Sequence, residues 1–246
     1  MRDGAVHVPL QFYATANYEC SYLPERQARS QVVVPSGLID QPVYSELVRQ
    51  GFRRSGQFVY RPWCDHCRAC IPVRVCVDEF SPSRTQRKVM QRLSAIRARL
   101  LPLNFHEQHF QLYLRYQHAR HSGGGMDEDT RDQYANFILQ SGVSSMLAEF
   151  VLDEQVVMVS LIDQLDDGLS AVYTFFDPEL VRASLGVYNV LWQVGLARQL
   201  GLPFVYLGYW IRECRKMAYK DRYRPFDALI EGRWQRVGDQ LDVGGA

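Results

Sequence analysis

Two stretches of this sequence bring together side chains that could do chemistry, and the first is rich in cysteine. Cys64, Cys67 and Cys70 recur at a spacing that can bring three thiolates to one metal ion, with Cys20 as a fourth ligand. A structural zinc or an iron–sulfur cluster would suit such thiols, and a compact turn with reduced thiols is the alternative. Because no second Cys-x-x-Cys or Cys/His pair completes a zinc site, we assign no metal ligand and no required cofactor.

The second stretch, residues 209–224, mixes cations with aromatic rings. Its six cations and two acids give a net charge of +4. Aromatic faces can stack on unpaired bases while cations bind phosphates, so the mixture is typical of a site for a single-stranded nucleic-acid end. A solvated loop whose charges pair locally would have the same composition. The cations are Arg212, Arg215, Lys216, Lys220, Arg222 and Arg224, and the aromatic residues are Tyr209, Trp210, Tyr219 and Tyr223.

A basic stripe lies on the helix that is predicted to begin after Ser81-Pro82-Ser83. Arg84, Lys88 and Arg92 follow at four-residue spacing, as either a solvated helix face or a surface that tracks phosphates. The apolar positions of the same stretch fall on one helical face, which predicts a helix that continues until Pro102. These apolar residues are Val89, Leu93, Ile96 and Leu100.

The charge of the whole chain hides a division between its halves. The net charge is +1, but residues 1–103 carry +7 and residues 104–246 carry −6. We therefore predict a basic, cysteine-containing domain over 1–103, a second domain over 104–238 and a tail over 239–246. No apolar run of 18 residues and no signal peptide occurs, so we expect a cytoplasmic protein whose six cysteines are reduced thiols or metal ligands.

The elements that must position these residues predict a mixed α/β (α+β) fold. In the first half we expect a strand at 31–34, a helix at 42–50, a strand–turn–strand over 52–60 and a strand at 71–77. In the second half, helices at 107–121 and 129–140 precede strands at 145–152, 155–164 and 169–176, a helix at 184–200 and a strand at 204–211. This order resembles a GNAT-like acyltransferase domain in the C-terminal half, beside a smaller N-terminal α+β domain.

Motifs in both halves carry a resemblance that covers nearly the whole chain. They include Cys20-Ser-Tyr-Leu-Pro24, Arg53-Arg-Ser-Gly56, the Cys64–Cys70 stretch, Ser83-Arg-Thr-Gln-Arg87, Tyr173-Thr-Phe-Phe-Asp-Pro178, Tyr206-Leu-Gly-Tyr-Trp-Ile211, Cys214-Arg-Lys-Met-Ala-Tyr-Lys220 and Gly232-Arg-Trp234. With these motifs the chain resembles the bacterial aspartate/glutamate leucyltransferases. These leucyl-tRNA–protein transferases are related to the arginyl-tRNA–protein transferases.

The resemblance implies an activity in the N-end rule degradation pathway. Leucine would move from leucyl-tRNA to the α-amine of proteins that begin with Asp or Glu, and the products would pass to downstream degradation machinery. The eukaryotic arginyl branch is associated with an iron–sulfur cluster on N-terminal cysteines, and here Leu23 stands where a second early cysteine would be needed. No membrane partner is expected.

The resemblance and the charge pattern together suggest the site residues. The catalytic candidates are Tyr219, as a proton donor to the leaving ribose hydroxyl, and Lys220. The predicted substrate-binding residues are Arg53, Arg54, Tyr209, Lys216, Arg222, Tyr223 and Arg224, and the predicted tRNA-binding residues are Arg84, Arg87, Lys88 and Arg92.

Three other functions remain open. An arginyl transferase with the same acceptors is the nearest, since no pocket residue separates the two donors. A non-enzymatic, metal-stapled RNA-binding module could use the same basic half. An N-acetyltransferase would share the fold, but the stretch Arg182–Gly186 departs from the usual pyrophosphate-binding loop by one missing glycine and one extra residue.

Overall fold

A small antiparallel sheet is built from the first third of the chain. The computed structural model describes residues 9–121 and 130–237. The strands of this sheet are β1 (Gln11–Ala14), β4 (Ser30–Val34), β6 (Phe58–Pro62) and β5 (Arg53–Ser55), in that order. The two-stranded pair β2 (Tyr18–Glu19) and β3 (Gln27–Ala28) and the 3-10 turn η1 (Ser36–Leu38) accompany it.

Helix α1 (Gln41–Arg49) packs on this small sheet. The Asp40 side chain accepts a hydrogen bond from the backbone N–H of Val43 and so caps the helix N-terminus. Gly51 follows the helix with φ +87°, a backbone conformation that favours glycine and ends the helix. The α1 side chains Tyr44, Leu47 and Val48 are buried against the sheet. After the helix, the chain turns sharply into β5.

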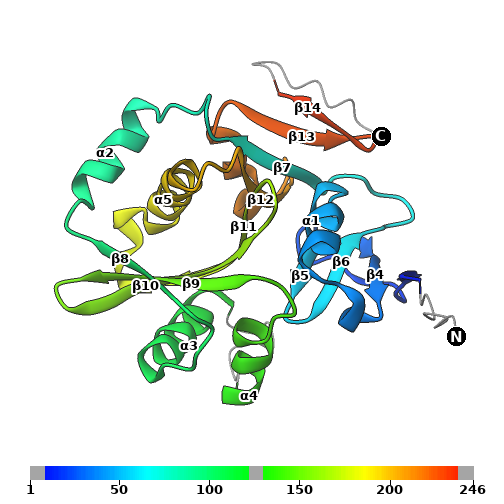
Figure 1. Cartoon of the computed structure of the whole chain (residues 1–246), viewed down its shortest axis with the longest axis horizontal. Helices are drawn as coiled ribbons and strands as arrows, with labels where there is room; N and C mark the ends of the chain where they lie inside the picture. Colours follow the sequence, from blue (N-terminus) through cyan, green and yellow to red (C-terminus); the bar gives the residue numbers. More distant parts are fainter. Residues whose placement is uncertain (1–8, 122–129, 238–246) are drawn as a thin grey trace, which may run out of the picture.

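An eight-stranded sheet forms the larger part of the molecule (Figure 1). Its strands are β14 (Arg233–Arg236), β13 (Phe226–Ile230), β7 (Ile71–Cys76), β12 (Phe204–Trp210), β11 (Gly168–Phe176), β10 (Gln155–Gln164), β9 (Ser145–Leu152) and β8 (Arg97–Leu101), in spatial order. Only β11 and β12 pair in parallel, and α5 (Leu185–Gln199) crosses between them.

Helices cover both faces of this sheet. In Figure 1 the sheet curves around α5, which packs against β11, β12 and α2 (Arg84–Arg92). On the other face, α3 (Glu107–His121) packs against β10 and β11, beside the short α4 (Arg131–Tyr134) and the following turn η2 (Ala135–Leu139). The remaining elements are η3 (Pro178–Ala183), α6 (Arg215–Ala218) and η4 (Tyr219–Arg222). No helix in the described ranges is both long enough and apolar enough to span a membrane.

The prediction of one helix up to Pro102 is wrong beyond Arg92. Leu93 and Ile96 are buried as the pattern suggests, but the chain turns between them and continues as β8. Residues Arg97–Leu101 pair with β9 at the edge of the large sheet. Backbone hydrogen bonds to β9 at that edge outweigh the local helical pattern of the apolar residues. A pattern at 3.6-residue spacing cannot reveal this pairing, because the partner strand is distant in the sequence.

The predicted boundary at residue 103 does not separate two sheets. β7 and β8 both precede it in the chain, and both are strands of the eight-stranded sheet. β7 lies between β12 and β13, so the two halves share one sheet at its centre. The predicted tail over 239–246 falls on the residues outside the description.

Candidate active site

The parallel strands β11 and β12 separate from one another within the large sheet. They pair only at Gly168–Ser170 with Phe204–Tyr206, although both strands continue further. Each strand carries a bulge at the same level, because the register with its outer neighbour skips Val172 in β11 and Leu207 in β12. Bulges often re-aim backbone and side chains beside active sites. We therefore place the candidate site at the split between β11 and β12.

Arg53 of β5 fills the beginning of this split. Its Nη2 donates hydrogen bonds to the carbonyl oxygens of Ala171 at 2.9 Å and Val172 at 2.7 Å, where β11 has lost its β12 partner. A Cβ atom at Gly208 would lie 2.4 Å from Arg53 Nη1, so only glycine leaves room for the guanidinium. Gly208 also has φ +73°, which glycine adopts without strain.

Tyrosines surround the Arg53 guanidinium. It lies 5.9 Å from the centroid of the Tyr209 ring, and Tyr22, Tyr60 and Tyr219 lie close enough to interact with it electrostatically. Burial raises the pKa of Tyr22 to about 12, and the neighbouring cation opposes this shift. Burial raises the pKa of Tyr209 and Tyr219 as well, so these two rings and that of Tyr22 stay neutral at physiological pH. They leave the guanidinium without a neutralising carboxylate among the side chains described around it.

The Nε and Nη1 donors of Arg53 make no hydrogen bond within residues 9–121 and 130–237. With its Nε and Nη1 donors unused, the guanidinium can still donate a charge-assisted hydrogen bond to a carboxylate. This makes Arg53 the strongest of the predicted substrate-binding residues on geometric grounds.

Lys220 lies behind this site and is only 3% exposed. Its Nζ donates to the backbone carbonyl of Tyr209 and contacts the sulfur of Met217 at 3.2 Å. Burial, aided by the positive charge of Arg53, lowers the Lys220 pKa to about 7. With its amine held below the surface, Lys220 ties η4 to the end of β12 and has no direct access to a substrate.

The other predicted residues of 209–224 fall into two groups. Tyr209 and Tyr223 are buried, with the Tyr209 hydroxyl donating to the carbonyl of Gly51 at 3.0 Å. Tyr219 is 37% exposed, and its ring meets that of Tyr223 edge to face. Lys216 and Arg222 are exposed, and Arg224 lies over the ring of Phe226. Tyr219 is thus a partly exposed ring of this segment near Arg53, and burial raises the pKa of its phenol.

Arg54, also predicted to bind substrate, uses its donors in hydrogen bonds within the protein. Its side chain faces away from the split because successive strand residues point to opposite sides. Nε and Nη2 bind the two carboxylate oxygens of Asp163 at 2.7 and 2.6 Å, and Nη1 donates to the carbonyl of Gly56 at 3.0 Å. Tyr44 and Ser145 donate to the same carboxylate. With every guanidinium nitrogen occupied and the pair buried, Arg54 has a structural role.

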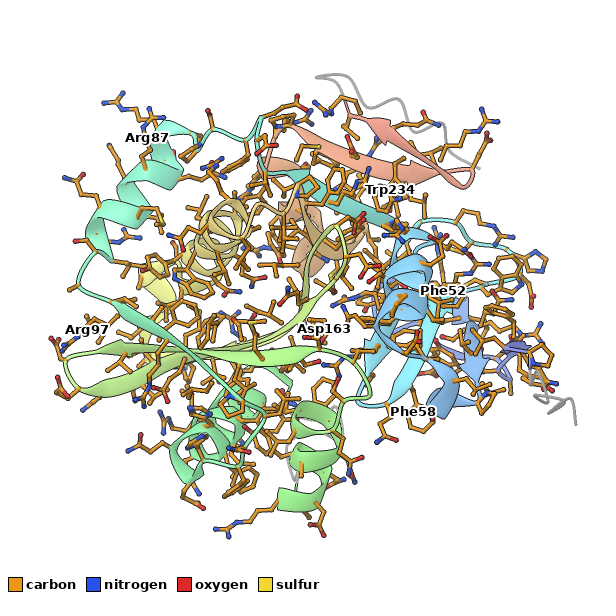
Figure 2. The ribbon with its side chains drawn as sticks, viewed as in Figure 1. Phe52, Phe58, Arg87, Arg97, Asp163 and Trp234 are labelled. Atoms are coloured by element: carbon orange, nitrogen blue, oxygen red, sulfur yellow. The ribbon has the colours of Figure 1, made fainter. Side chains whose placement is uncertain are left out.

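The basic stripe of α2 lies apart from the split. Arg84, Arg87, Lys88 and Arg92 are all exposed. Two of them bond locally, Arg87 to the carbonyl of Pro82 and Arg92 to that of Ala183. Figure 2 shows Arg87 on the far side of α5 from the small sheet, which carries Arg53. The stripe contributes nothing to the split itself.

The cysteines cluster without forming a metal centre. Cys20, Cys67, Cys70 and Cys214 pack with Leu23 around one small apolar core. Burial, reinforced by the neighbouring thiols, raises the Cys70 pKa to about 12, so this thiol stays protonated. In the described part of the chain, no group of three His, Cys, Asp or Glu side chains is arranged to hold a metal ion. As they stand, the thiols do not fit a zinc ion or a cluster.

The family models divide the chain much as its charge does. The model of the N terminus of arginine-tRNA-protein transferases matches residues 18–88, and that of their C terminus matches residues 108–230. A protein named aspartate/glutamate leucyltransferase from Chromobacterium violaceum is 62% identical, over 96% of this chain and 98% of that protein. Relatives of the same name from Thiobacillus denitrificans and Nitrosospira multiformis are each 58% identical, over 93% and 95% of this chain and 95% and 93% of theirs.

The chain belongs to the aspartate/glutamate leucyltransferase family. The resemblance drawn from the sequence motifs is confirmed, and with it the assignment of the chain as a transferase. Family membership also explains why Arg53 and Gly208, from distant parts of the chain, both lie within stretches that carry the resemblance.

Gly208 and the split were missed at the level of sequence. An isolated glycine within a strand pattern signals a bulge or a close approach of backbone, and Gly208 in Phe204–Trp210 is such a signal. The divergence of β11 from β12 leaves no comparable trace, because it depends on strand pairing between distant segments.

Proposed function

We propose that this chain transfers leucine from leucyl-tRNA to the N-terminal α-amine of proteins that begin with Asp or Glu. Family membership supports the transferase activity, and the observation that carries the acceptor assignment is Arg53, with two unused donors, in the split between β11 and β12. We also propose that the large sheet is GNAT-like. Its support is the antiparallel run β9–β10–β11, followed by a helix and a parallel strand that diverges.

The proposed reaction is aminolysis of an ester. The free α-amine has a pKa of about 7.7–8.0, so a useful neutral fraction exists near pH 7. The amine attacks the leucyl carbonyl, a C–N amide bond forms, and the C–O bond to the terminal ribose breaks. The proton lost by the amine ends on the ribose hydroxyl. Because the ester is already activated, alignment of the two substrates supplies most of what the enzyme must provide.

Arg53 aligns the acceptor in this proposal. Its Nη1 donates a charge-assisted hydrogen bond to the side-chain carboxylate of the first acceptor residue, while Nη2 stays fixed on Ala171 and Val172. A neutral amide in place of the carboxylate would lose the charge of this pair, which favours Asp and Glu over Asn and Gln.

Tyr219 is the proposed proton donor to the ribose. The residue is 37% exposed, and burial of its phenol raises the pKa of that group, which keeps it protonated. Lys220 positions it from below through η4. The α2 stripe of Arg84, Arg87, Lys88 and Arg92 is proposed to bind phosphates on the body of the tRNA. Action in the cytoplasm, ahead of the degradation machinery, completes the proposal.

One experiment tests this function. Purified protein is incubated with a peptide that begins with Asp and with total tRNA charged with all amino acids, and the peptide is then weighed by mass spectrometry. A gain of one leucine residue is expected, and a matched peptide that begins with Asn should be modified far more slowly. A gain of arginine would show the arginyl activity instead. No gain with any charged tRNA would reject the proposal.

A further inference from the structure

An open cleft of about 450 Å³ lies beside the candidate active site. It is bounded by the C-terminal end of α1, by β6 with the loop after it, and by the β13–β14 hairpin. Its lining includes Arg49, Arg61, Arg68, Trp63, Trp234 and a single carboxylate, Glu46. We call this surface the Trp63 cleft. The family names give this cleft no role, and neither does the candidate site around Arg53.

The guanidinium of Arg61 lies close to two aromatic rings. It lies 4.6 Å from the centroid of Phe52 and 4.8 Å from that of Trp63. Its hydrogen bonds go to the side chain of Gln31 and the carbonyl of Gln50, which are neutral. Within the described ranges, no carboxylate neutralises Arg61. The protein has thus fixed a cation in place at the cleft without cancelling its charge.

Arg68 supplies a second cation of the same kind. It is exposed, and its Nη1 donates to the carbonyls of Cys64 and Cys67 in its own loop. No carboxylate of the described residues pairs with it either. Arg49, by contrast, pairs with Glu46 at 3.0 Å, which accounts for the carboxylate of the lining. The cleft therefore retains the positive charge of Arg61 and Arg68.

Exposed aromatic surface accompanies this charge. Trp63 is 49% exposed, an unusual placement for an indole that could otherwise be buried. Trp234 is fixed by a hydrogen bond from its Nε1 to the carbonyl of Arg49 at 2.9 Å. Flat rings beside fixed cations match the two features of single-stranded nucleic acid, which are stacked bases and regularly spaced phosphates.

The cleft and the split share a wall. Tyr209 lines the cleft, its ring lies over the Arg53 guanidinium, and its carbonyl accepts from Lys220. Cys70, beside Lys220, lines the cleft as well. A chain lying in the cleft would therefore have its end next to the place where the acceptor amine is proposed to bind. The α2 stripe offers no such proximity, since Figure 2 shows Arg87 across the molecule from Trp234.

We infer that the Trp63 cleft binds the single-stranded 3′ end of the aminoacyl-tRNA. The inference rests on the proposed function and places its donor substrate. Bases stack on the exposed indole of Trp63, and Arg61 and Arg68 bind the phosphates between them. The duplex part of the acceptor arm stays outside the cleft, which is too small to admit it.

The cleft suits RNA better than it suits the acceptor protein. An acceptor with one acidic residue needs one cation, and Arg53 has the free donors for it. Two separated cations and an exposed indole would remain unexplained by a short acidic peptide. A role in acceptor binding is nevertheless an outcome that the experiment below can detect.

The test compares binding of two uncharged leucine tRNAs, one complete and one without its single-stranded 3′ nucleotides. Wild-type protein should bind the complete tRNA more tightly. The Trp63→Leu and Arg68→Gln variants, separately and together, should weaken binding of complete tRNA by roughly fivefold to a hundredfold and leave the truncated tRNA unaffected. Loss of one phosphate contact in Arg68→Gln should also reduce the slope of log K against log salt by about 0.7.

Arg97→Gln is the matched control, because Arg97 is equally cationic and exposed but lies on β8 at the far edge of the large sheet (Figure 2). It should bind both tRNAs as the wild type does. Thermal unfolding of each variant verifies its fold, and Arg68→Gln removes an exposed side chain whose loss leaves the core intact.

Several results would overturn the inference. Equal binding of complete and truncated tRNA by the wild type would show that the 3′ end is not held. Cleft variants that bind complete tRNA normally but have a raised KM for the Asp peptide would assign the cleft to the acceptor. Because binding is measured without transfer, 3′-dependent binding by a wild type that transfers no leucine would reject the proposed function and leave the cleft assignment standing.

Discussion

Arg53 and Arg54 are neighbours in β5, yet they have opposite relations to their surroundings. Arg54 meets a carboxylate that satisfies its charge, and Asp163 in turn receives hydrogen bonds from Tyr44 and Ser145. Figure 2 shows Asp163 where β10 approaches the small sheet. Arg53 meets two backbone carbonyls and several neutral tyrosines, so its charge is left for a ligand. The ion pair of Arg54 and Asp163 holds the two sheets together, whereas the Arg53 cation, which no carboxylate of the described residues neutralises, marks a site.

The largest expected effect on stability comes from removing one partner of the Arg54–Asp163 ion pair. Arg54→Met leaves the fully buried Asp163 carboxylate without its cation, and we expect a loss of about 3–5 kcal/mol in the free energy of unfolding. Urea denaturation at pH 7 measures this loss. The double variant Arg54→Met/Asp163→Leu should recover much of the stability, because it leaves no uncompensated charge. A single variant as stable as the wild type would refute the structural role of Arg54.

Arg53→Met should affect catalysis more than stability. Loss of a charge-assisted pair with the acceptor carboxylate removes about 1.5–3 kcal/mol of binding in the transition state, a decrease of roughly 10- to 150-fold in kcat/KM for a peptide beginning with Asp. Steady-state kinetics on Asp and Asn peptides measure this effect, with Arg97→Met as the control. The variant should lose its preference for Asp over Asn. An equal fall on both peptides would instead indicate that Arg53 only supports the fold.

Gly208→Ala disturbs the Arg53 guanidinium from β12. A methyl group there would contact the Arg53 guanidinium, and the positive φ costs a residue with a side chain about 1–2 kcal/mol. We expect that loss in the free energy of unfolding, together with reduced Asp-over-Asn discrimination. Gly201→Ala provides the control, because Gly201 has a similar φ of +68° but open space around it. Equal discrimination in the two variants would separate Gly208 from the function of Arg53.

The smallest effect concerns Lys220 and its dependence on pH. Its pKa is about 7 in the folded protein and about 10.4 in the unfolded chain, so the unfolded chain binds more protons between these values. Stability from this group is therefore lowest below pH 7 and increases as the pH rises. Between pH 6.5 and 8, wild-type protein should gain on the order of 1 kcal/mol relative to Lys220→Met. Parallel stability curves in urea denaturation would show that Lys220 does not titrate in this range.

Local patterns predict most elements of this fold. The helices at 107–121 and 184–200 and the strands at 145–152, 155–164 and 169–176 lie within a residue or two of their predicted bounds. The helix after Ser83 is one exception, since β9 draws residues 97–101 into its own sheet. The strands β1, β13 and β14 were not predicted at all. Arg53 and the 209–224 segment were also named from sequence, because their residue types and motifs identify the family.

The chemistry of each arginine was beyond the reach of those patterns. Two adjacent arginines in one strand are equivalent in the sequence, and only the sheets on either side decide that one meets Asp163 and the other meets an opened strand pair. The sequence alone determined the family, the order of elements and the types of residue available. The tertiary structure decided which of them are neutralised and which are left for substrates, because pairing between distant strands sets the neighbours of every side chain.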